Sequence, residues 1–313
     1  MLNKYLPEGS LIATPENREY ISSLQGLERA RGEGKILEGV VTKCDSNSMR
    51  LYVDLYGITG VIEREECLIG DEIKDIAIIT RVGKAVAFKV MQITKAGGEV
   101  RAILSRRAAQ RECMENYLMD LTPGDIIPAK ITHFEPFGAF LDIGCGIASL
   151  MSVDSVSVSR ISSPKDRFSE REELNVIVKS IDYETGRIYV STKELFGTWE
   201  ENASEYQAGQ TVFGIVRSIE SYGIFVELAP NLAGLAELKE GVKVGESCAV
   251  YIKSIIPEKM KIKLVIIDTY DELRQLDTKK HYKINTAKVK HISSWRYSPA
   301  SCERIIETVF DLS

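Results

Sequence analysis

The pattern of apolar and polar positions divides most of the chain into short alternating runs. Three segments repeat one order: an apolar run after a glycine, a second run that ends in Asp or Glu, a turn of small residues, and two further runs. β-branched residues dominate these runs, and Gly, Asp and Asn separate them. This pattern is typical of small sheets or barrels. Because the order returns, we predict an all-β protein of three similar domains in series.

The second segment shows the repeated order most clearly. It reads GDIIPAKITHFEPFGAFLDIGCGIASLM and, after an excursion, ELNVIVKSIDYETGRIYVSTK. The third reads GQTVFGIVRSIESYGIFVELAPNLAGLAEL and GESCAVYIKSIIPEKMKIKLVIID. The first reads GKILEGVVTKCDSNSMRLYVDLYGITGVIERE and GKAVAFKVMQITKAGGEVRAILSRR. Each segment covers about 60 to 70 residues, which is enough for one small domain.

Polar stretches with helical spacing lie between the repeats. Arg106–Leu121 carries an apolar or aromatic residue at every fourth position from Ala109 to Leu121, and Thr122-Pro123-Gly124 ends the stretch. Residues 193–206 link the second and third repeats in a similar way. We predict short helical spacers at both places.

The N-terminal region also predicts a helix. Thr14 is suited to the N-cap and Pro15 to the first helical position, and Tyr20, Leu24 and Leu27 form an apolar stripe. The helix either packs on the first repeat or remains a frayed arm, because short isolated helices are marginally stable.

These patterns divide the chain into seven predicted parts. They are an N-terminal helical arm (1–34), a degenerate first repeat (35–105), a helical linker (106–122), the second repeat (123–194), a helical linker (195–207), the third repeat (208–267), and a basic C-terminal extension (268–313) for which we expect a small α+β structure.

Composition narrows the functional class. The chain has 313 residues, 44% hydrophobic and 27% charged, and no apolar run approaches the roughly 20 residues of a membrane span. The N-terminus lacks the order of a secretory signal, so we expect a cytoplasmic protein without a membrane partner. The net charge of -5 argues against coating duplex DNA by charge alone. It is compatible with single-strand binding, because base stacking needs only a local basic groove.

Sites for catalysis or metal binding have little support in the sequence. The six cysteines are Cys44, Cys67, Cys113, Cys145, Cys248 and Cys302, and they form no CxxC pair. With three histidines in the whole chain, they predict neither a zinc site nor a disulfide framework. No P-loop, HExxH or GxSxG sequence is present, and His133 has no partner for a general-base role. We therefore expect no enzyme activity, no metal and no cofactor.

An aromatic–glycine–aromatic unit occurs twice, in PFGAFLDIG (136–144) and YGIFVELAP (222–230). Phe137 and Phe140 are three positions apart, so a regular strand would point them to opposite faces. A bulge or a positive φ at Gly138 would bring both rings to one face, where they would form a stacking platform. The alternative is that both rings fill the core. Tyr222 favours the platform, because its polar tip suits a partly wetted ring.

With these units, the chain resembles the RNA-binding OB-fold family first defined in bacterial small-subunit ribosomal protein S-one. The resembling residues are Gly124 with PFGAFLDIG, GCGIASLMSVDSVSVSRIS and IDYETGRIYVSTK in repeat two, and GIVRSIESYGIFVEL, NLAGLAEL and MKIKL in repeat three. The resemblance covers residues 35–267, and LSRRAAQRE resembles the joint between domains of that family. It implies three tandem five-stranded OB-fold barrels.

The resemblance also implies which residues contact RNA, namely those on strands 2 and 3 and near the turn between strands 4 and 5. They are Phe137, Phe140, Ser152, Asp182 and Arg187 in repeat two, and Tyr222, Phe225, Glu237, and Lys259 or Lys261 in repeat three. Both repeats lack the histidine that this family often has on strand 3. Glu237 would repel phosphate unless a lysine such as Lys239 offsets it.

Repeat one departs further from the family pattern. Met49 and Tyr52 stand at the aromatic positions, Arg50 replaces the glycine, and Glu63 stands at the histidine position. By analogy with the ribosomal protein, repeat one is expected to be a protein-contact or structural module.

Two further segments leave alternatives open. The excursion 153–171 holds Arg160, Lys165, Arg167 and Arg171, which either track phosphates or pair with Asp166, Glu170 and Glu172 in a solvated loop. Residues 279–296 (KKHYKINTAKVKHISSWR) contain no acidic residue. They either contact RNA or belong to a small cap in which Trp295 and Phe310 are core and SPASCERIIETVF forms a capped helix.

The sequence thus predicts a non-catalytic protein that binds single-stranded RNA. The resemblance implies a monomer that acts in translation and holds mRNA at the small ribosomal subunit. The alternative is an RNA-binding adaptor in RNA decay, transcription or stress response that is not stably bound to the ribosome.

Overall fold

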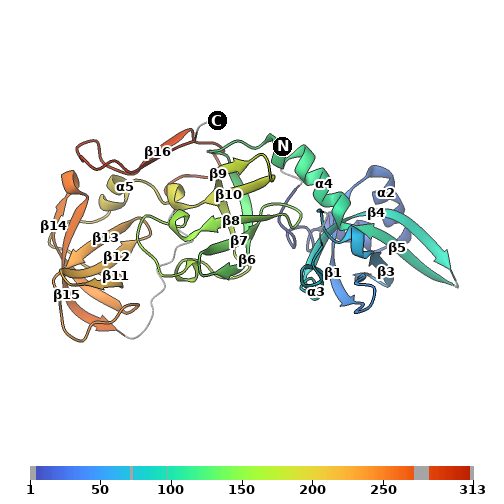
Figure 1. The fold of residues 1–313 in the computed structure, drawn as a ribbon, viewed down its shortest axis with the longest axis horizontal. Coiled ribbons are helices and arrows are strands. Elements are labelled where there is room, and N and C mark those ends of the chain that lie inside the picture. Colours follow the sequence, from blue (N-terminus) through green and yellow to red (C-terminus); the bar gives the residue numbers. More distant parts are fainter. Residues whose placement is uncertain (1–4, 71–72, 97, 271–281, 311–313) are drawn as a thin grey trace. The chain divides into compact units, whose positions relative to one another are not determined.

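Three closed five-stranded barrels lie within the residues that the computed structural model describes, which are 5–70, 73–96, 98–270 and 282–310 (Figure 1). Barrel 1 contains β1 (Ile36–Cys44), β2 (Leu51–Leu55), β3 (Ile58–Ile62), β4 (Ala85–Ala96) and β5 (Glu99–Ser105). Barrel 2 contains β6 (Ile126–Glu135), β7 (Gly138–Asp142), β8 (Ala148–Ser152), β9 (Glu173–Asp182) and β10 (Arg187–Ser191). Barrel 3 contains β11 (Thr211–Glu220), β12 (Gly223–Ala229), β13 (Leu232–Ala236), β14 (Ser247–Ile256) and β15 (Lys261–Tyr270). The predicted all-β fold of three barrels is confirmed.

One topology recurs in the three barrels. The first three strands form antiparallel neighbours, the third strand pairs in parallel with the fifth, and the fourth strand closes the barrel between the fifth and the first. Alternate residues of each strand therefore face a filled core, while the others face outward. In β15, for example, Ile262, Leu264 and Ile266 are buried and the residues between them are exposed.

The N-terminal arm forms two helices instead of the single one predicted. They are α1 (Pro15–Ile21) and α2 (Leu24–Glu33). Thr14 caps α1 as expected, with its hydroxyl accepting from the Asn17 N–H at 3.2 Å, and Ser23 caps α2 in the same way. Tyr20 and Leu27 are buried in the core of barrel 1. The frayed-arm alternative is therefore wrong.

The remaining helices are short. The linker after barrel 1 is α4 (Arg106–Asn116), which ends where Tyr117 leaves helical geometry. Other short helices are α3 (Asp75–Ile79), α5 (Trp199–Ala203) and the 3-10 turns η1 (Arg64–Glu66), η2 (Leu118–Asp120), η3 (Val153–Ser155), η4 (Pro164–Asp166), η5 (Lys193–Phe196) and η6 (Pro257–Lys259). Among the described residues, no helix is long and apolar enough to cross a membrane.

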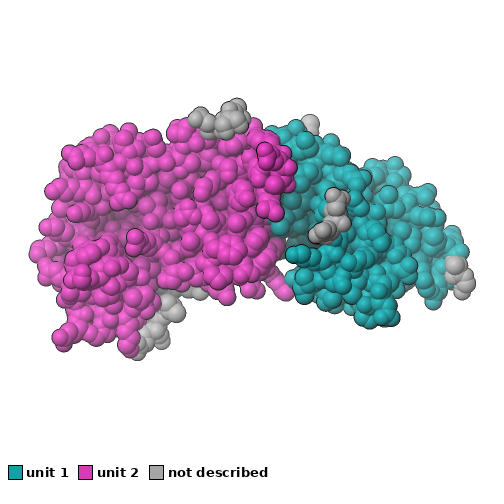
Figure 2. Space-filling model, viewed as in Figure 1, with its two compact units in different colours: residues 1–121, 128–130, 142–148 teal, residues 122–127, 131–141, 149–313 magenta. Residues whose placement is uncertain are grey.

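The chain forms two compact units (Figure 2). The first contains barrel 1, α1, α2, α4, and residues 128–130 and 142–148. Its interior holds a buried ion pair, in which the Arg106 guanidinium donates to both carboxylate oxygens of Glu8 at 2.6 and 3.0 Å. The second unit contains the rest of barrel 2, barrel 3 and the C-terminal segment (residues 282–310).

A buried ion cluster joins barrels 2 and 3 inside the second unit. Arg167, from the excursion of barrel 2, donates to the Glu227 carboxylate on β12, and both side chains are fully buried. Arg217 on β11 donates to the other Glu227 oxygen at 2.5 Å. Arg167 is therefore neither free to contact phosphate nor part of a solvated loop, and both predicted alternatives are wrong for this residue. Arg160, Lys165 and Arg171 are exposed, so either alternative remains open for them.

The C-terminal segment packs along both barrels of the second unit. Trp295 and Tyr297 join the core of barrel 3, and Phe310 joins a cluster with Ile126, Ile177 and Leu195. SPASCERIIETVF does not form the expected helix; β16 (Ser294–Arg296) instead pairs with β17 (Glu307–Val309). The prediction that Trp295 and Phe310 are core residues of a small cap is confirmed. The prediction that this cap contains a helix is wrong. Residues 279–281 of the basic stretch lie outside the described residues.

Candidate nucleic-acid interface

Phe137 and Phe140 lie on one outward face of barrel 2. Phe137 stands in the turn between β6 and β7, and Phe140 lies within β7. Their rings meet edge to face with centroids 6.1 Å apart at 83°. Phe137 is 55% exposed and Phe140 is half-buried, so neither ring is core filling. The rings form an exposed aromatic step of the kind on which bases stack.

Gly138 enables this arrangement in a different way from the one predicted. It is not among the residues with positive φ, and Phe137 precedes the strand, so strand alternation does not apply to Phe137. A Cβ on Gly138 would lie 2.4 Å from the carbonyl oxygen of Met151 on β8. The predicted positive φ at Gly138 is therefore wrong, the bulge stays a prediction, and close packing of β7 on β8 explains the glycine.

Barrel 3 repeats the aromatic step. Tyr222 is 67% exposed, and its ring meets that of Phe225 edge to face at 6.1 Å and 90°. Here the glycine does have a positive φ, because Gly223 lies at +154°. A Cβ at this position would lie 2.6 Å from the carbonyl oxygen of Ala236. Both conformation and space therefore require glycine.

His133 extends the platform of barrel 2 and was missed by the sequence analysis. Its ring stacks on Phe140 with centroids 4.6 Å apart and planes at 8°, and the residue is exposed. The neighbouring Thr132 hydroxyl donates to the Phe140 carbonyl at 3.0 Å. A tight turn at 136–137 brings residue 133 opposite residue 140 in an antiparallel hairpin. His133 could therefore have been predicted from the register of this hairpin.

An outward row crosses four strands of barrel 3. Register pairs Ser218 with Phe225, Phe225 with Leu235, and Leu235 with Lys263. Paired residues project from the same side of a sheet, so Lys263 shares a face with Phe225. Lys263 was not predicted from the sequence, which indicated Lys259 or Lys261. Both of these are exposed near the start of β15, and they remain predictions.

Ser152 lies in a small polar cluster beside the rings of barrel 2. Its hydroxyl is 2.9 Å from that of Ser155, which accepts from Lys179 Nζ at 2.8 Å. A hydrogen bond from Ser152 and the nearby Lys179 lower the pKa of Asp154. The Val153 N–H donates to the Phe137 carbonyl at 3.1 Å, so this cluster adjoins the platform.

Asp182 and Arg187 lie at the hairpin between β9 and β10, where they face each other in register. The Asp182 carboxylate accepts from the Glu184 and Thr185 N–H groups at 3.0 and 3.1 Å and from the Thr185 hydroxyl at 2.6 Å. The hydrogen bonds from Thr185 lower its pKa. Asp182 therefore shapes the turn, while Arg187 is exposed beside it.

Glu237 does not have the partner expected from the sequence. Lys253 Nζ lies 4.0 Å from its carboxylate. Lys239 instead donates to the carbonyl oxygens of Ile266 and Ile267, at 3.3 and 2.6 Å. The prediction of Lys239 as the offsetting cation is therefore wrong, and Lys253 takes that place.

Barrel 1 has no equivalent aromatic pair among its described residues. Met49 packs against the barrel core. Arg50, at the position that glycine has in the other barrels, pairs with Glu63 at 2.5 Å. Tyr52 remains, with Lys43 Nζ 5.9 Å from its ring centroid. At the positions that form the aromatic step in the other barrels, barrel 1 thus has an ion pair and a single ring.

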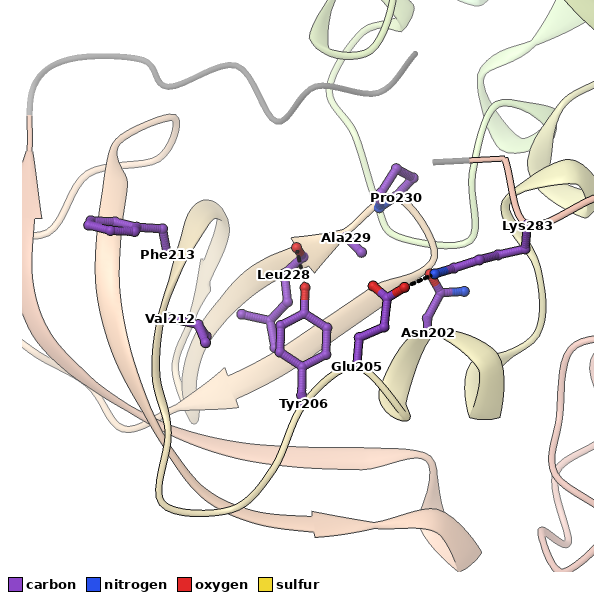
Figure 3. A pocket seen from close by; sticks show the side chains of 9 residues that line it. All are labelled: Asn202, Glu205, Tyr206, Val212, Phe213, Leu228, Ala229, Pro230 and Lys283. Atoms are coloured by element: carbon purple, nitrogen blue, oxygen red, sulfur yellow. Dashed lines mark hydrogen bonds and ion pairs between the residues drawn. The ribbon is translucent and has the colours of Figure 1, made fainter. Parts of the chain in front are cut away.

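A pocket of about 250 Å³ lies at the base of barrel 3, between α5, β12 and the C-terminal segment (Figure 3). Its polar side chains already bond to other protein groups: Lys283 pairs with Glu205, the Tyr206 hydroxyl donates to the Leu228 carbonyl at 3.0 Å, and Asn202 donates to backbone carbonyls. The pocket therefore has the character of a packing gap. The described residues contain no cluster of His, Cys, Asp and Glu suited to a metal ion.

Comparison with known proteins gives consistent results. The model of the S1 RNA binding domain matches residues 120–193, which contain barrel 2. Small ribosomal subunit protein bS1 of Staphylococcus aureus (strain COL) is 30% identical over 237 residues, covering 74% of this chain and 58% of that protein. The bS1 protein of Leuconostoc lactis is 29% identical over 197 residues, covering 58% and 45%. The chain thus spans about half the length of the curated relatives it matches.

A solved multidomain protein with nucleic acid binding domains from Streptococcus pneumoniae TIGR4 is also similar. The two proteins are 15% identical, and the match covers 75% of this chain and 74% of the other chain. The TM-score is 0.25. The sequence likenesses are more informative. Barrel 2 thus matches the S1 RNA binding domain family, and the likeness to bS1 extends over 237 residues, far beyond that barrel.

Proposed function

We propose that the chain binds single-stranded RNA by stacking unpaired bases on two aromatic steps, Phe137 with Phe140 and Tyr222 with Phe225. The observation that carries the proposal is that barrels 2 and 3 each present an edge-to-face ring pair on an outward face. Stacking contributes about 1–3 kcal/mol per base. It requires no overall positive charge, which suits a chain of net charge -5.

The other predicted contacts complete the interface. The residues proposed to contact the RNA backbone are Ser152, Arg187, Lys259 and Lys261. Asp182 is proposed to act by shaping the turn between β9 and β10, and Glu237 by its contact with Lys253. Two platforms in one compact unit raise the effective concentration of the second contact, so modest affinity at each barrel is sufficient.

The role we favour is in translation. The relatives named above are small ribosomal subunit proteins. By that likeness, the chain acts as a cytoplasmic monomer, without enzymatic activity, that holds mRNA at the small subunit, and barrel 1 serves in protein contact. The second candidate is an RNA-binding adaptor outside the ribosome, which the altered face of barrel 1 favours.

Equilibrium binding tests the stacking proposal. Fluorescence anisotropy with unstructured labelled RNA compares the wild type with the double variant Phe137→Ala, Phe140→Ala. We expect at least a tenfold loss, because two rings are removed. A change below about threefold would show that barrel 2 is not the platform. Co-sedimentation of the full chain with purified small subunits separates the two roles, because the adaptor role predicts no stable association.

A further inference from the structure

A lysine occupies the same irregular position in barrels 2 and 3. In each barrel a register shift between the fourth and fifth strands leaves one residue of the fourth strand outside the ladder, and in barrel 3 the same pair of strands has a second shift, between Ala249 and Val250. The bulged residues are Lys179, between the pairs Ser180–Tyr189 and Val178–Val190, and Lys253, between the pairs Ser254–Lys263 and Ile252–Leu264. A bulge of this kind re-aims its side chain relative to the regular strand.

Both bulged lysines point to the segment that follows the third strand. Lys179 Nζ lies 2.8 Å from the Ser155 hydroxyl and 3.7 Å from the Asp154 carboxylate. Lys253 Nζ lies 4.0 Å from the Glu237 carboxylate. Their side chains are 34% and 61% exposed, so both ammonium groups are within reach of solvent and of a ligand.

The same segment adjoins the first ring of each platform. In barrel 2, a Cβ on Gly138 would lie 3.1 Å from the Cα of Ser152, and the next N–H donates to the Phe137 carbonyl. In barrel 3, Glu237 follows Ala236, whose carbonyl oxygen would lie 2.6 Å from a Cβ on Gly223. Each lysine, on the fourth strand, therefore contacts the segment that adjoins the aromatic step of its own barrel.

Barrel 1 provides the contrast. Its β4 has the same register shift, and the bulged residue there is Met91, which is 52% exposed. The barrel without an aromatic pair is thus also the barrel without a bulged lysine. The lysine is not needed to form the bulge, because barrel 1 forms it with methionine.

We propose that Lys179 and Lys253 are phosphate-binding residues, each holding the backbone of a single strand whose bases stack on the adjacent ring pair. This inference rests on the proposed function. The carboxylates beside them do not prevent it, because exposed ion pairs contribute only about 0–1 kcal/mol and an ammonium group can turn from them to a phosphate. In the unbound protein, Asp154 and Glu237 lie beside the lysines, in the segment that adjoins the rings.

The salt dependence of binding tests the inference, since each phosphate contact on a single strand adds about 0.7 to the slope of log K against log salt concentration. The full chain is titrated with labelled oligouridine at several salt concentrations. We expect Lys179→Met and Lys253→Met each to reduce the slope by about 0.7, and the double variant to reduce it by about 1.4. Methionine is the residue that barrel 1 carries at this bulge.

Lys243→Met is the matched control. Lys243 also lies beside a carboxylate, 3.9 Å from Glu246, but it stands in the loop before β14, outside the row of Phe225 and Lys263. Its loss removes the same charge, and we expect the slope to remain that of the wild type. An equal fall in the control would show a general charge effect and overturn the assignment.

The platform variant Tyr222→Ala, Phe225→Ala separates the two proposals. It removes stacking and no charge, so it should lower affinity at every salt concentration and leave the slope unchanged. If this variant weakens binding while the lysine variants keep the wild-type slope, the phosphate assignment fails and the stacking proposal stands. If neither kind of variant affects binding, both fail.

Discussion

The rings of His133 and Phe140 stack in parallel 4.6 Å apart on the outer face of barrel 2. They come from neighbouring strands, and Phe137 adds a third ring at an angle of 83° to Phe140. This geometry makes barrel 2 the larger of the two platforms, because barrel 3 has Ser218 in the position of His133.

Replacing His133 tests that difference. His133→Ala removes the ring that supports Phe140, and an aromatic pair contributes about 0.5–1.5 kcal/mol. We expect RNA affinity to fall by about 2- to 10-fold in fluorescence anisotropy. Tyr56→Ala removes a 62% exposed ring of barrel 1 and should leave affinity unchanged. Equal effects of the two substitutions would remove His133 from the interface.

Adding a methyl group at Gly138 should displace the platform. The new Cβ would lie 2.4 Å from the Met151 carbonyl oxygen, so β7 and β8 must move apart near Phe137. We expect Gly138→Ala to weaken RNA binding by at least about threefold, the effect of losing part of one stack. Gly32→Ala is the control, because Gly32 does not have a positive φ and no atom lies within 4 Å of its Cβ. Wild-type affinity in Gly138→Ala would contradict the proposed role of the glycine.

The buried ion cluster predicts a large loss of stability in the second unit. Glu227→Ala leaves Arg167 and Arg217 without their shared carboxylate, and breaking a buried pair costs about 3–5 kcal/mol. Both tryptophans, Trp199 and Trp295, lie in this unit, so tryptophan fluorescence during urea unfolding reports its stability. Lys243→Ala removes a 78% exposed lysine, 3.9 Å from Glu246 in the same unit, and should cost less than about 1 kcal/mol. Similar urea midpoints for the two variants would show that the buried ion cluster does not stabilise the second unit.

Two neighbouring residues test the packing of the C-terminal segment. Phe310 is 7% exposed in a cluster with residues of barrel 2, whereas Val309 is 55% exposed. Phe310→Ala should reduce the free energy of unfolding of the second unit by about 3–5 kcal/mol, and Val309→Ala by less than about 0.5 kcal/mol. Tryptophan fluorescence measures both. Equal, small effects would mean that the segment does not stabilise the unit.

Glu38 predicts a pH dependence of the first unit. Burial raises its pKa from 4.5 to about 7, although three backbone N–H groups donate to its carboxylate. The folded state therefore keeps a proton that the unfolded state releases above pH 4.5. Its contribution to stability is complete below pH 4.5 and is lost as the pH rises through 7.

The variant Glu38→Gln removes this titration. Between pH 5 and pH 8, the wild type should lose more stability than the variant, by about 2–3 kcal/mol for a shift of this size. Pulsed hydrogen exchange of β1 peptides during urea unfolding measures the first unit at each pH. Parallel pH profiles for the two proteins would contradict the buried, protonated state of Glu38.

Strand patterning predicted the barrels because alternation and turn residues are local signals. The same local reasoning identified the ring pairs, since both rings and the glycine lie within four residues. It misjudged Gly138, because the reason for that glycine is a carbonyl oxygen on β8 that no local pattern indicates. His133 and Lys263 were missed for a related cause: they join the face only through strand register.

The C-terminal segment and Arg167 show the limit set by long-range contacts. SPASCERIIETVF carries a helical pattern, yet pairing of β16 with β17 and burial of Phe310 outweigh that preference. Arg167 lies in a run of charges that suggests exposure, and its partner Glu227 is 60 residues away. Side-chain partners at this separation are determined by the packing of one barrel on another.

Photo-crosslinking tests the central claim most directly. Single-stranded RNA with 4-thiouridine is bound to the full chain and irradiated, and the modified residues are mapped by mass spectrometry. The account predicts crosslinks at Phe137, Phe140, Tyr222 and Phe225, with none on the outward face of barrel 1 around Tyr52. Crosslinks concentrated on barrel 1, with the four rings unmodified, would contradict it.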